Sequence, residues 1–426
     1  MLLTQHYSPS PICSPARAGI LTGRYPHRTG AIETRELRGL CNLALRETTV
    51  ADLLKARGYA TGLVGKWHTG CYHPKWHPNA RGFDEFAGFR SGWQDYWNWV
   101  LDRNGAFEKS DGRYLTDVFT DEAVGFIDRH KHRPFFLFLC YNAPHTPLHA
   151  PAEDVKPFAD TGKFTTGVST IYGMVRRMDR GIERLLEALD RRGLRDNTLV
   201  VFTSDNGPQF GGRGDSCIER FNCDLSGSKS KVYEGGIRVP AILRWPDGLP
   251  GENVRFGGMA HGTDWMPTLL AAAGAEPPAE LRLDGTNILP ALRSESSDLP
   301  PRRFWQWNRW EPRIETNAAM RDGDWKLVRP SIRGLSDTDP EEQKLDDAYR
   351  SEPWGRHELI VGPYPPREIP VPPPAELYNI AEDPLERNNL ADRHPERVER
   401  MMRALLDWFE DVEADRASIG GHWAGA

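Results

Sequence analysis

Residues 10–17, with the sequence SPICSPAR, combine a thiol with groups that attract anions. Ser14 is a favourable N-cap and Pro15 suits the first helical position, so the pattern predicts that a helix begins here. Cys13 would then lie just before the positive end of the helix, where free N–H groups and the helix dipole attract negative charge. Arg17 adds a forked cation that can neutralise an oxyanion. The segment therefore predicts an activated thiol at an anion-binding site.

Three further groups of polar residues each follow a short apolar segment that is predicted to be a strand. The strands and the residues after them are Thr61–Val64 with Lys66 and His68, Pro134–Tyr141 with His145, and Thr198–Thr203 with Asp205 and Asn206. In open α/β sheets, ligands bind outside the carboxyl ends of the strands. If the three strands are parallel neighbours, these side chains converge on one crevice. Each group alone is more typical of a solvated loop or a turn, and it is their joint occurrence that indicates a site.

The pattern from Cys13 to Arg17, followed by LTGR at 21–24, resembles the C-x-P-x-R signature of the type I sulfatase family. Later stretches resemble further motifs of this family in the same order: GKWH at 65–68, PHTP at 144–147, SDNG at 204–207 and KSKVYEGGIRVP at 229–240. Residues 376–379, with the sequence ELYN, resemble the closing segment of the family. The resemblance thus covers nearly the whole chain, and its five ordered motifs are far more specific than the C-x-P-x-R pattern alone.

The resemblance implies that a maturation enzyme oxidises Cys13 to formylglycine. The hydrated aldehyde carries two geminal hydroxyls, of which one attacks sulfur and the other then loses a proton and expels sulfate. A serine could not take the second step. The implied roles are sulfate binding by Lys66, His145 and Lys229, assistance to the leaving oxygen by His145 or Lys229, proton acceptance by His68, and orientation of the formylglycine by Arg17. Counting back from Tyr233 favours Lys229 over Lys231 as the sulfate-binding lysine.

Asp205 and Asn206 offer hard oxygen ligands, which suit calcium, or magnesium, better than zinc. Members of the family also carry a strand and two adjacent aspartates, both metal ligands, a few dozen residues before the cysteine. Only twelve residues precede Cys13 here, and two protein ligands are too few for a dependable calcium site. We therefore expect the 426-residue chain to be poorly active and to leave a central position of its sheet empty, with unpaired backbone groups on the neighbouring strands.

Three functions are compatible with these residues. The first is a sulfuric ester hydrolase that acts on aryl or carbohydrate sulfates. The second is a phosphonate or phosphodiester hydrolase, because some relatives with the same oxidised cysteine prefer phosphorus esters. The third is a module that binds sulfated ligands without turnover, which the missing aspartate pair favours. An aromatic stretch could stack on sugar rings or pack inside the domain; its members are Trp93, Tyr96, Trp97 and Trp99.

The elements that must position these residues fall into two parts. Residues 1–292 alternate apolar runs with helical patterns, which predicts an α/β domain, and the resemblance implies an alkaline-phosphatase-like sheet sandwiched by helices, incomplete at its N-terminus. Residues 293–426 are predicted to form a smaller C-terminal antiparallel sheet plus helix. Strands are predicted at Phe304–Trp310 and at Ala318–Val328, and the second run folds into a hairpin at Asp322 and Gly323. A final helix is predicted to carry an apolar face made of Val398, Met401, Leu405, Phe409 and Val412. Residues 330–375 are charged and rich in proline, and are predicted to be irregular.

Composition excludes some partners. A net charge of −6 argues against a nucleic-acid-binding surface. The longest apolar run, residues 135–141, has seven residues, far fewer than the ~18 of a membrane span. None of the six cysteines matches a zinc module, although Cys217 and Cys223 share a polar loop and could form a disulfide. No signal peptide is visible, and the cellular location stays open.

Overall fold

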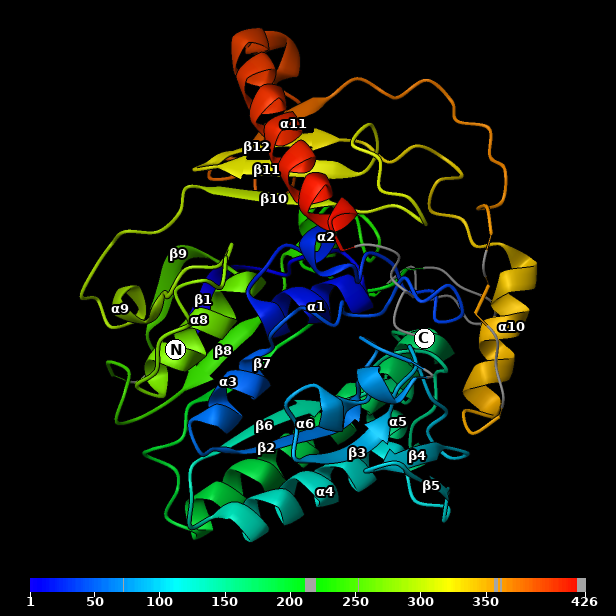
Figure 1. Ribbon diagram of the computed structural model, residues 1–426, viewed down its shortest axis with the longest axis vertical. Coiled ribbons are helices and arrows are strands. Elements are labelled where there is room, and N and C mark those ends of the chain that lie inside the picture. Colours follow the sequence, from blue (N-terminus) through cyan, green and yellow to red (C-terminus); the bar gives the residue numbers. More distant parts are fainter. Residues whose placement is uncertain (72, 211–219, 252, 356–358, 361, 420–426) are drawn as a thin grey trace.

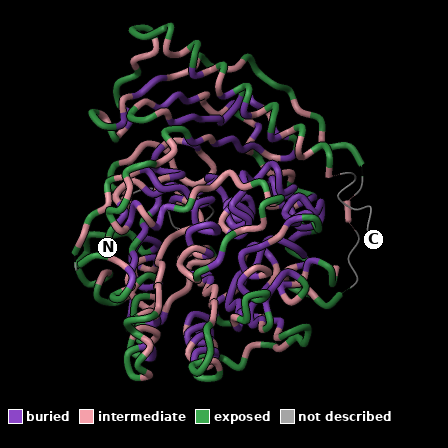
Figure 2. The backbone as a smooth tube through the Cα atoms, turned by 60° about the vertical axis from the view of Figure 1, so that its left-hand side comes forward, coloured by how far each residue is buried: buried purple, intermediate pink, exposed green. Residues whose placement is uncertain are grey.

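The computed structural model describes residues 1–71, 73–210, 220–251, 253–355, 359–360 and 362–419. In this part, the chain forms three sheets, of five, four and four strands, with helices packed around them (Figure 1). Buried residues gather in the middle of the molecule, between the C-terminal sheet and the helices at the opposite end (Figure 2). The predicted α/β architecture with a smaller antiparallel sheet near the C-terminus is confirmed.

The five-stranded sheet holds two of the strands that precede candidate site residues. Its strands, in spatial order, are β5 (Ala106–Lys109), β4 (Val100–Arg103), β3 (Glu85–Phe89), β2 (Ala60–Lys66) and β6 (Phe135–Cys140). Strand β2 runs parallel to both β3 and β6, so the carboxyl ends of β2 and β6 meet at one edge of the sheet.

Helices cover both faces of this sheet. On the lower face in Figure 1, α4 (Leu115–His130) lies along the strands, α6 (Thr166–Arg191) packs on α4, and α5 (Ala152–Ala159) packs on α6. The opposite face is covered by α3 (Val50–Ala56) and α8 (Trp265–Ala272), whose apolar side chains share one buried cluster with Leu63 and Trp67. The apolar positions of β2 are thus buried on both sides, which fixes the direction in which the residues after it leave the sheet.

The second sheet contains the third predicted strand. Its order is β7 (Val200–Thr203), β8 (Ala241–Arg244), β1 (Leu2–Tyr7) and β9 (Arg255–His261). The condition that all three strands are parallel neighbours does not hold for β7, which lies in this second sheet and pairs with β8 in antiparallel register. Within the described residues, β6 pairs only with β2 and β7 only with β8, so each is an edge strand. Both edge strands are only half-buried, apart from the last residue of β6.

The third sheet and the last helix form the predicted C-terminal unit. The sheet is antiparallel, in the order β10 (Arg302–Gln306), β11 (Ala318–Asp322), β12 (Trp325–Arg329) and β13 (Glu376–Asn379). Helix α11 (Pro395–Ala417) buries Met401, Leu405 and Val412 against it, as the apolar stripe predicts. Tyr25 belongs to the same apolar cluster, so this unit shares its core with the N-terminal part. The boundary at residue 292 stays a prediction.

Helix α10 (Pro340–Ser351) contradicts the prediction that residues 330–375 are irregular. The Asp339 side chain caps it by accepting hydrogen bonds from the backbone N–H groups of Glu341 and Glu342, and a proline occupies the first turn. Its buried residues are Glu342, Asp346 and Tyr349. The buried face is therefore mainly charged, and apolar periodicity, which identifies most surface helices, gives no sign of it.

Three further helices are short: α2 (Pro26–Thr29), α7 (Glu234–Ile237) and α9 (Leu289–Leu292). Among the residues that the structure describes, no helix combines the length and the apolar character needed to cross a membrane. The possible disulfide between Cys217 and Cys223 involves a residue outside the described part of the chain, and Cys223 is exposed.

Candidate active site

Helix α1 (Cys13–Thr22) begins at Cys13 itself. The predicted N-cap is wrong: Ile12 takes that position without a side-chain cap, and the Ser14 hydroxyl donates a hydrogen bond to the carbonyl of Cys41 at 3.1 Å. The start of the helix is buried against the loop that carries Cys41, so the hydroxyl serves a tertiary contact. The Cys13 thiol is 4% exposed and lies in the first turn, where the free N–H groups and the helix dipole favour negative charge.

The end of β2 delivers two of the predicted residues to this thiol. Gly65 has a φ of +103°, and a Cβ built on it would lie 2.0 Å from the carbonyl oxygen of Cys140 at the end of β6. Glycine therefore permits β2 and β6 to approach closely at the crevice. Lys66 and His68, which follow, are 3% and 2% exposed. Burial lowers the pKa of both side chains below their usual values.

Cationic and hydrogen-bonding groups converge on the Cys13 thiol. Burial alone would raise the pKa of Cys13, but the charges of Lys229 and Lys66 and the neighbouring side chains of His145 and His68 outweigh it. As a result, the pKa of Cys13 lies well below its ordinary value. The surroundings of this position thus stabilise an anion, as the sequence predicts.

Lys229 and His145 form a pair on one side of the crevice. The Lys229 Nζ atom lies 3.2 Å from His145 Nε2, and His145 Nδ1 donates to the carbonyl of Thr146 at 2.7 Å. Since Nδ1 carries the proton, Nε2 accepts the hydrogen bond from the lysine. Burial and the charge of Lys229 lower the pKa of His145 to about 4. Lys231 instead donates to the Ser331 hydroxyl at 2.6 Å, so Lys229 is the lysine that the structure places at the crevice.

The second histidine, His68, has a free ring nitrogen. Its Nε2 atom lies 3.3 Å from the carbonyl oxygen of Thr34, which can only accept, so Nε2 carries the proton. Nδ1 is buried and makes no hydrogen bond within the protein. A buried ring nitrogen without a partner, on a side chain that interacts with Cys13, is suited to accept a proton there.

Arg17 connects the separate elements of the site. Its Nε atom lies 3.0 Å from Asp205 Oδ2, and its Nη1 atom donates to the carbonyl of Lys66 at 2.7 Å. One guanidinium therefore ties α1 to the end of β2 and to the loop after β7, although β2 and β7 belong to different sheets. This is how Asp205 reaches the crevice without the predicted sheet pairing.

The surroundings of Asp205 and Asn206 suit metal ligands in part. The Asn206 Oδ1 atom is buried and has no hydrogen-bond partner, while its Nδ2 atom donates to the carbonyl of Gly207. An orphaned amide oxygen beside a carboxylate is the donor chemistry that a hard divalent cation takes. In the part of the chain that the structure describes, no cluster of three or more histidine, cysteine, aspartate or glutamate side chains could hold a metal. The two residues fit part of such a site but do not complete its ligand set.

Comparison with known proteins identifies the family. The family model described as "Sulfatase" matches residues 1–275. The chain belongs to the sulfatase family. Over 98% of its length it is 31% identical to the uncharacterized sulfatase YdeN of Escherichia coli (strain K12), and it covers 75% of that protein. It is 30% identical to arylsulfatase J of Mus musculus, with 94% of this chain and 69% of that protein aligned.

Solved structures agree with this assignment. The crystal structure of Ps i-CgsB in complex with k-i-k-neocarrahexaose superimposes with a TM-score of 0.77 at 30% identity, covering 96% of this chain and 84% of that one. The alkaline-phosphatase-like fold that the motifs imply is thereby confirmed. The crevice around Cys13 is accordingly the candidate active site of this sulfatase.

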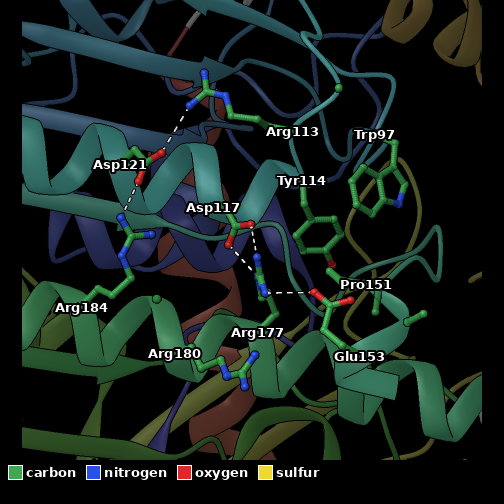
Figure 3. A pocket seen from close by; sticks show the side chains of 14 residues that line it. Trp97, Arg113, Tyr114, Asp117, Asp121, Pro151, Glu153, Arg177, Arg180 and Arg184 are labelled. Atoms are coloured by element: carbon green, nitrogen blue, oxygen red, sulfur yellow. Dashed lines mark hydrogen bonds and ion pairs between the residues drawn. The ribbon is translucent and has the colours of Figure 1, made fainter. Parts of the chain in front are cut away.

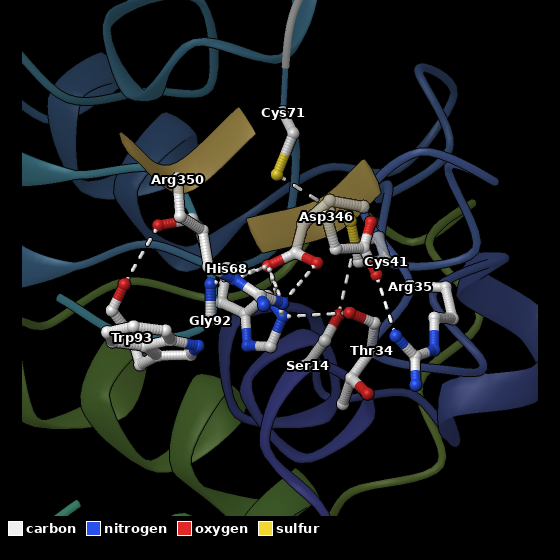
Figure 4. A network of polar contacts seen from close by, with 12 residues as sticks. Ser14, Thr34, Arg35, Cys41, His68, Cys71, Gly92, Trp93, Asp346 and Arg350 are labelled. Carbon is white, nitrogen blue, oxygen red and sulfur yellow. Dashed lines mark hydrogen bonds and ion pairs between the residues drawn. The ribbon is translucent and has the colours of Figure 1, made fainter. Parts of the chain in front are cut away.

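A network of polar contacts beside His68 in this sulfatase was not predicted from the sequence (Figure 4). Glu36 lies in the loop between α2 and α3, and its Oε1 atom is 3.8 Å from His68 Nε2. Arg350 of α10 binds the same carboxylate, with its Nη2 atom 2.7 Å from Oε2. No local motif marks either residue, and Arg350 lies in the segment that was predicted to be irregular.

A separate pocket of about 730 Å³ lies between α4 and α6 (Figure 3). Trp97 lines it, whereas Tyr96 and Trp99 are fully buried, so packing accounts for those two members of the aromatic stretch. Its charged groups pair with one another, as Arg177 does with Asp117 at 2.6 Å. None of the candidate catalytic residues of the sulfatase lines this pocket.

Proposed function

We propose that this sulfatase hydrolyses sulfate monoesters of aryl or carbohydrate compounds through a formylglycine derived from Cys13. The observation that carries the proposal is the convergence of Lys66, Lys229, His68 and His145 on Cys13, which holds the pKa of that thiol well below its ordinary value. A position that stabilises an anion so strongly suits an oxygen nucleophile and a bound sulfate group. The similarity to a protein crystallised with an oligosaccharide supports carbohydrate sulfates as substrates.

Lys66, Lys229 and His145 would bind the sulfate group. The two lysines offset its negative charge in a crevice where Lys66 is almost fully buried, and preorganised charges act most strongly where water is excluded. His145 accepts a hydrogen bond from Lys229 and, with a pKa of about 4, is neutral at pH 7. Lys229 therefore holds the proton that the leaving oxygen needs, and His145 fixes the direction of its ammonium group.

The hydrated formylglycine would supply the attacking hydroxyl and a second hydroxyl whose deprotonation releases sulfate. His68 is the residue placed to take that proton, because its Nδ1 atom is buried, unprotonated and without a partner. Arg17 would hold the start of α1 in register with Lys66 and Asp205 through its two hydrogen bonds. Each of these steps uses a group whose protonation state follows from its hydrogen bonds.

Substrate class is tested with the protein produced beside a formylglycine-generating enzyme and with calcium. We expect faster hydrolysis of an aryl sulfate than of an aryl phosphodiester, measured side by side, and release of sulfate from a sulfated oligosaccharide. Faster cleavage of the phosphodiester would instead indicate a hydrolase of phosphorus esters. Binding of the sulfated oligosaccharide without any turnover would support the non-catalytic alternative.

Cys13 is predicted to be converted to formylglycine by the maturation enzyme, because Cys13, Pro15 and Arg17 complete the pattern that the family carries. Mass spectrometry of the tryptic peptide that ends at Arg17 measures the conversion. The matched control is Arg17→Lys, which keeps the cleavage site but removes the motif arginine and should reduce conversion. An unmodified thiol in a preparation that fully converts another sulfatase would contradict the prediction.

We propose that Asp205 and Asn206 contribute to a divalent metal site, with calcium as the expected ion. Calcium at about 10 mM, well above the weakest protein sites, should raise the melting temperature of the protein, because ligands that bind only the folded state stabilise it. Asp205→Asn removes one charge and keeps the size of the side chain, so the rise should disappear. Asp247→Asn, at an exposed position, is the control and should keep it. An equal rise in both variants would place the calcium elsewhere.

A further inference from the structure

A row of buried ion pairs joins the loop between α2 and α3 to helix α10. The pairs are Arg35 Nη1–Asp346 Oδ2 at 2.8 Å, Glu36 Oε2–Arg350 Nη2 at 2.7 Å and Arg38 Nη2–Glu342 Oε1 at 2.6 Å. All six side chains are at most 9% exposed. The three helix positions are four residues apart and so share one face of α10. Buried pairs of this kind hold a fixed geometry, because losing one partner leaves an uncompensated charge.

The middle pair of this row faces the active site. Glu36 Oε1 lies 3.8 Å from His68 Nε2, and the backbone N–H of Gly92 donates to the same oxygen at 2.8 Å. A Cβ on Gly92 would lie 2.8 Å from His68 Cε1, so only glycine lets the backbone approach the ring this closely. The Glu36 carboxylate is thus held by Arg350 and Gly92 and stands beside the imidazole of His68.

We propose that Glu36 is a positioning residue for His68 and that Arg350 of α10 holds Glu36 in place. The inference rests on the proposed role of His68 as the proton acceptor. The Nε2–H group points to the Thr34 carbonyl and to Glu36, which leaves Nδ1 for the Cys13 side. When Nδ1 takes a proton, the ring becomes a cation beside a fixed carboxylate, and this lowers the free energy of the protonated form.

The other charged groups near His68 work against its protonation or belong to the reacting residue. Burial and the charge of Lys66 on β2 lower the pKa of His68, whereas Glu36 and the Cys13 side chain on α1 raise it. Arg350 acts on His68 through Glu36, whose carboxylate it binds. Removing the charge of Glu36 should therefore lower the pKa of His68 further and reduce its capacity to accept a proton.

The first test compares kinetics in the mature enzyme, with Cys13 converted. Glu36→Gln and Arg350→Met should each lower kcat by about 10- to 100-fold, as losing a partner that orients an active-site histidine does elsewhere, with little change in KM. A base works in its unprotonated form, so the acidic limb of the pH profile should move to lower pH in Glu36→Gln. The matched control is Glu342→Gln, which breaks the Arg38 pair of the same row. It should lower the melting temperature but leave kcat and the pH profile unchanged.

The second test does not depend on turnover. The ring of His68 can be titrated by NMR in protein with labelled histidine, and its signal is assigned by its absence in His68→Gln. The midpoint should move to lower pH in Glu36→Gln and stay in place in Glu342→Gln. An unchanged midpoint and an unchanged kcat in Glu36→Gln would overturn the inference, and so would equal losses of kcat in Glu36→Gln and Glu342→Gln. If the wild type hydrolyses no sulfate ester, the proposed function is wrong. The NMR titration would still show whether Glu36 acts on His68.

Discussion

Cys13→Ser is expected to turn the mature sulfatase into an enzyme that reacts only once. A serine hydroxyl in the same crevice can attack sulfur, but the position then has no second hydroxyl whose deprotonation would expel the sulfate. We expect release of one equivalent of alcohol per protein molecule, followed by no further turnover. Rapid-quench kinetics would measure the single burst, and mass spectrometry would find one sulfate group on the peptide that ends at Arg17.

Two variants serve as controls for this experiment. Cys13→Ala removes the nucleophile and should show no burst, with turnover lower by roughly 10⁶-fold, the size of loss seen when a nucleophile is deleted. Cys223→Ser changes an exposed thiol and should behave as the wild type. Continuous turnover by Cys13→Ser would show that release does not need a second hydroxyl, and the proposed mechanism would be wrong.

Lys229→Ala is expected to lower kcat by about 10²- to 10³-fold, the usual cost of one preorganised donor. The side chain faces Cys13 and lies 3.2 Å from His145, so its loss removes both a counter-charge for the sulfate and the proton for the leaving oxygen. Lys66→Ala should cost a similar factor, because Lys66 is buried beside the same thiol. Steady-state kinetics on an aryl sulfate measures both losses.

The natural control for these variants is two residues away. Lys231 donates to the Ser331 hydroxyl at 2.6 Å and does not interact with Cys13. Lys231→Ala should therefore keep kcat within about threefold of the wild type, the range of a surface substitution of roughly 0.5 kcal/mol. If Lys231→Ala lost as much activity as Lys229→Ala, the sulfate-binding lysine would have been wrongly assigned.

Most of the crevice could be predicted because its residues are marked by their neighbours in the sequence. Lys66 comes just after a short, mainly apolar run at 61–64, His145 follows another apolar run, and Cys13 opens a helix. Local order therefore already indicates which side chains leave the sheet at one edge. The pairing of the strands was harder to predict from the sequence. An apolar run shows that β7 is a strand, but its pairing with β8 depends on a segment about forty residues later in the chain.

Glu36 and Arg350 could not have been found in this way. They are 314 residues apart, and each lies in a segment without apolar periodicity. Helix α10 faces the protein with charged residues that are matched one by one by charges on the loop, and a stripe of buried ion pairs has the same composition as a solvated surface. The prediction that Ser14 caps the helix was wrong for a related reason, since its hydroxyl donates to the carbonyl of Cys41, in another part of the chain.

Strand β6 has a consequence for how the protein behaves in solution. Its six residues, FFLFLC, carry no charge and no proline, and along one edge no strand is paired with them in the described part of the chain. Natural sheets protect such edges with lysine, proline or a bulge, and uncharged aromatic segments of this length are the ones that stack into cross-β assemblies. As long as that edge is uncovered, β6 can template association between molecules. Such association would limit the concentration at which the protein stays monomeric, in spite of its net charge of −6.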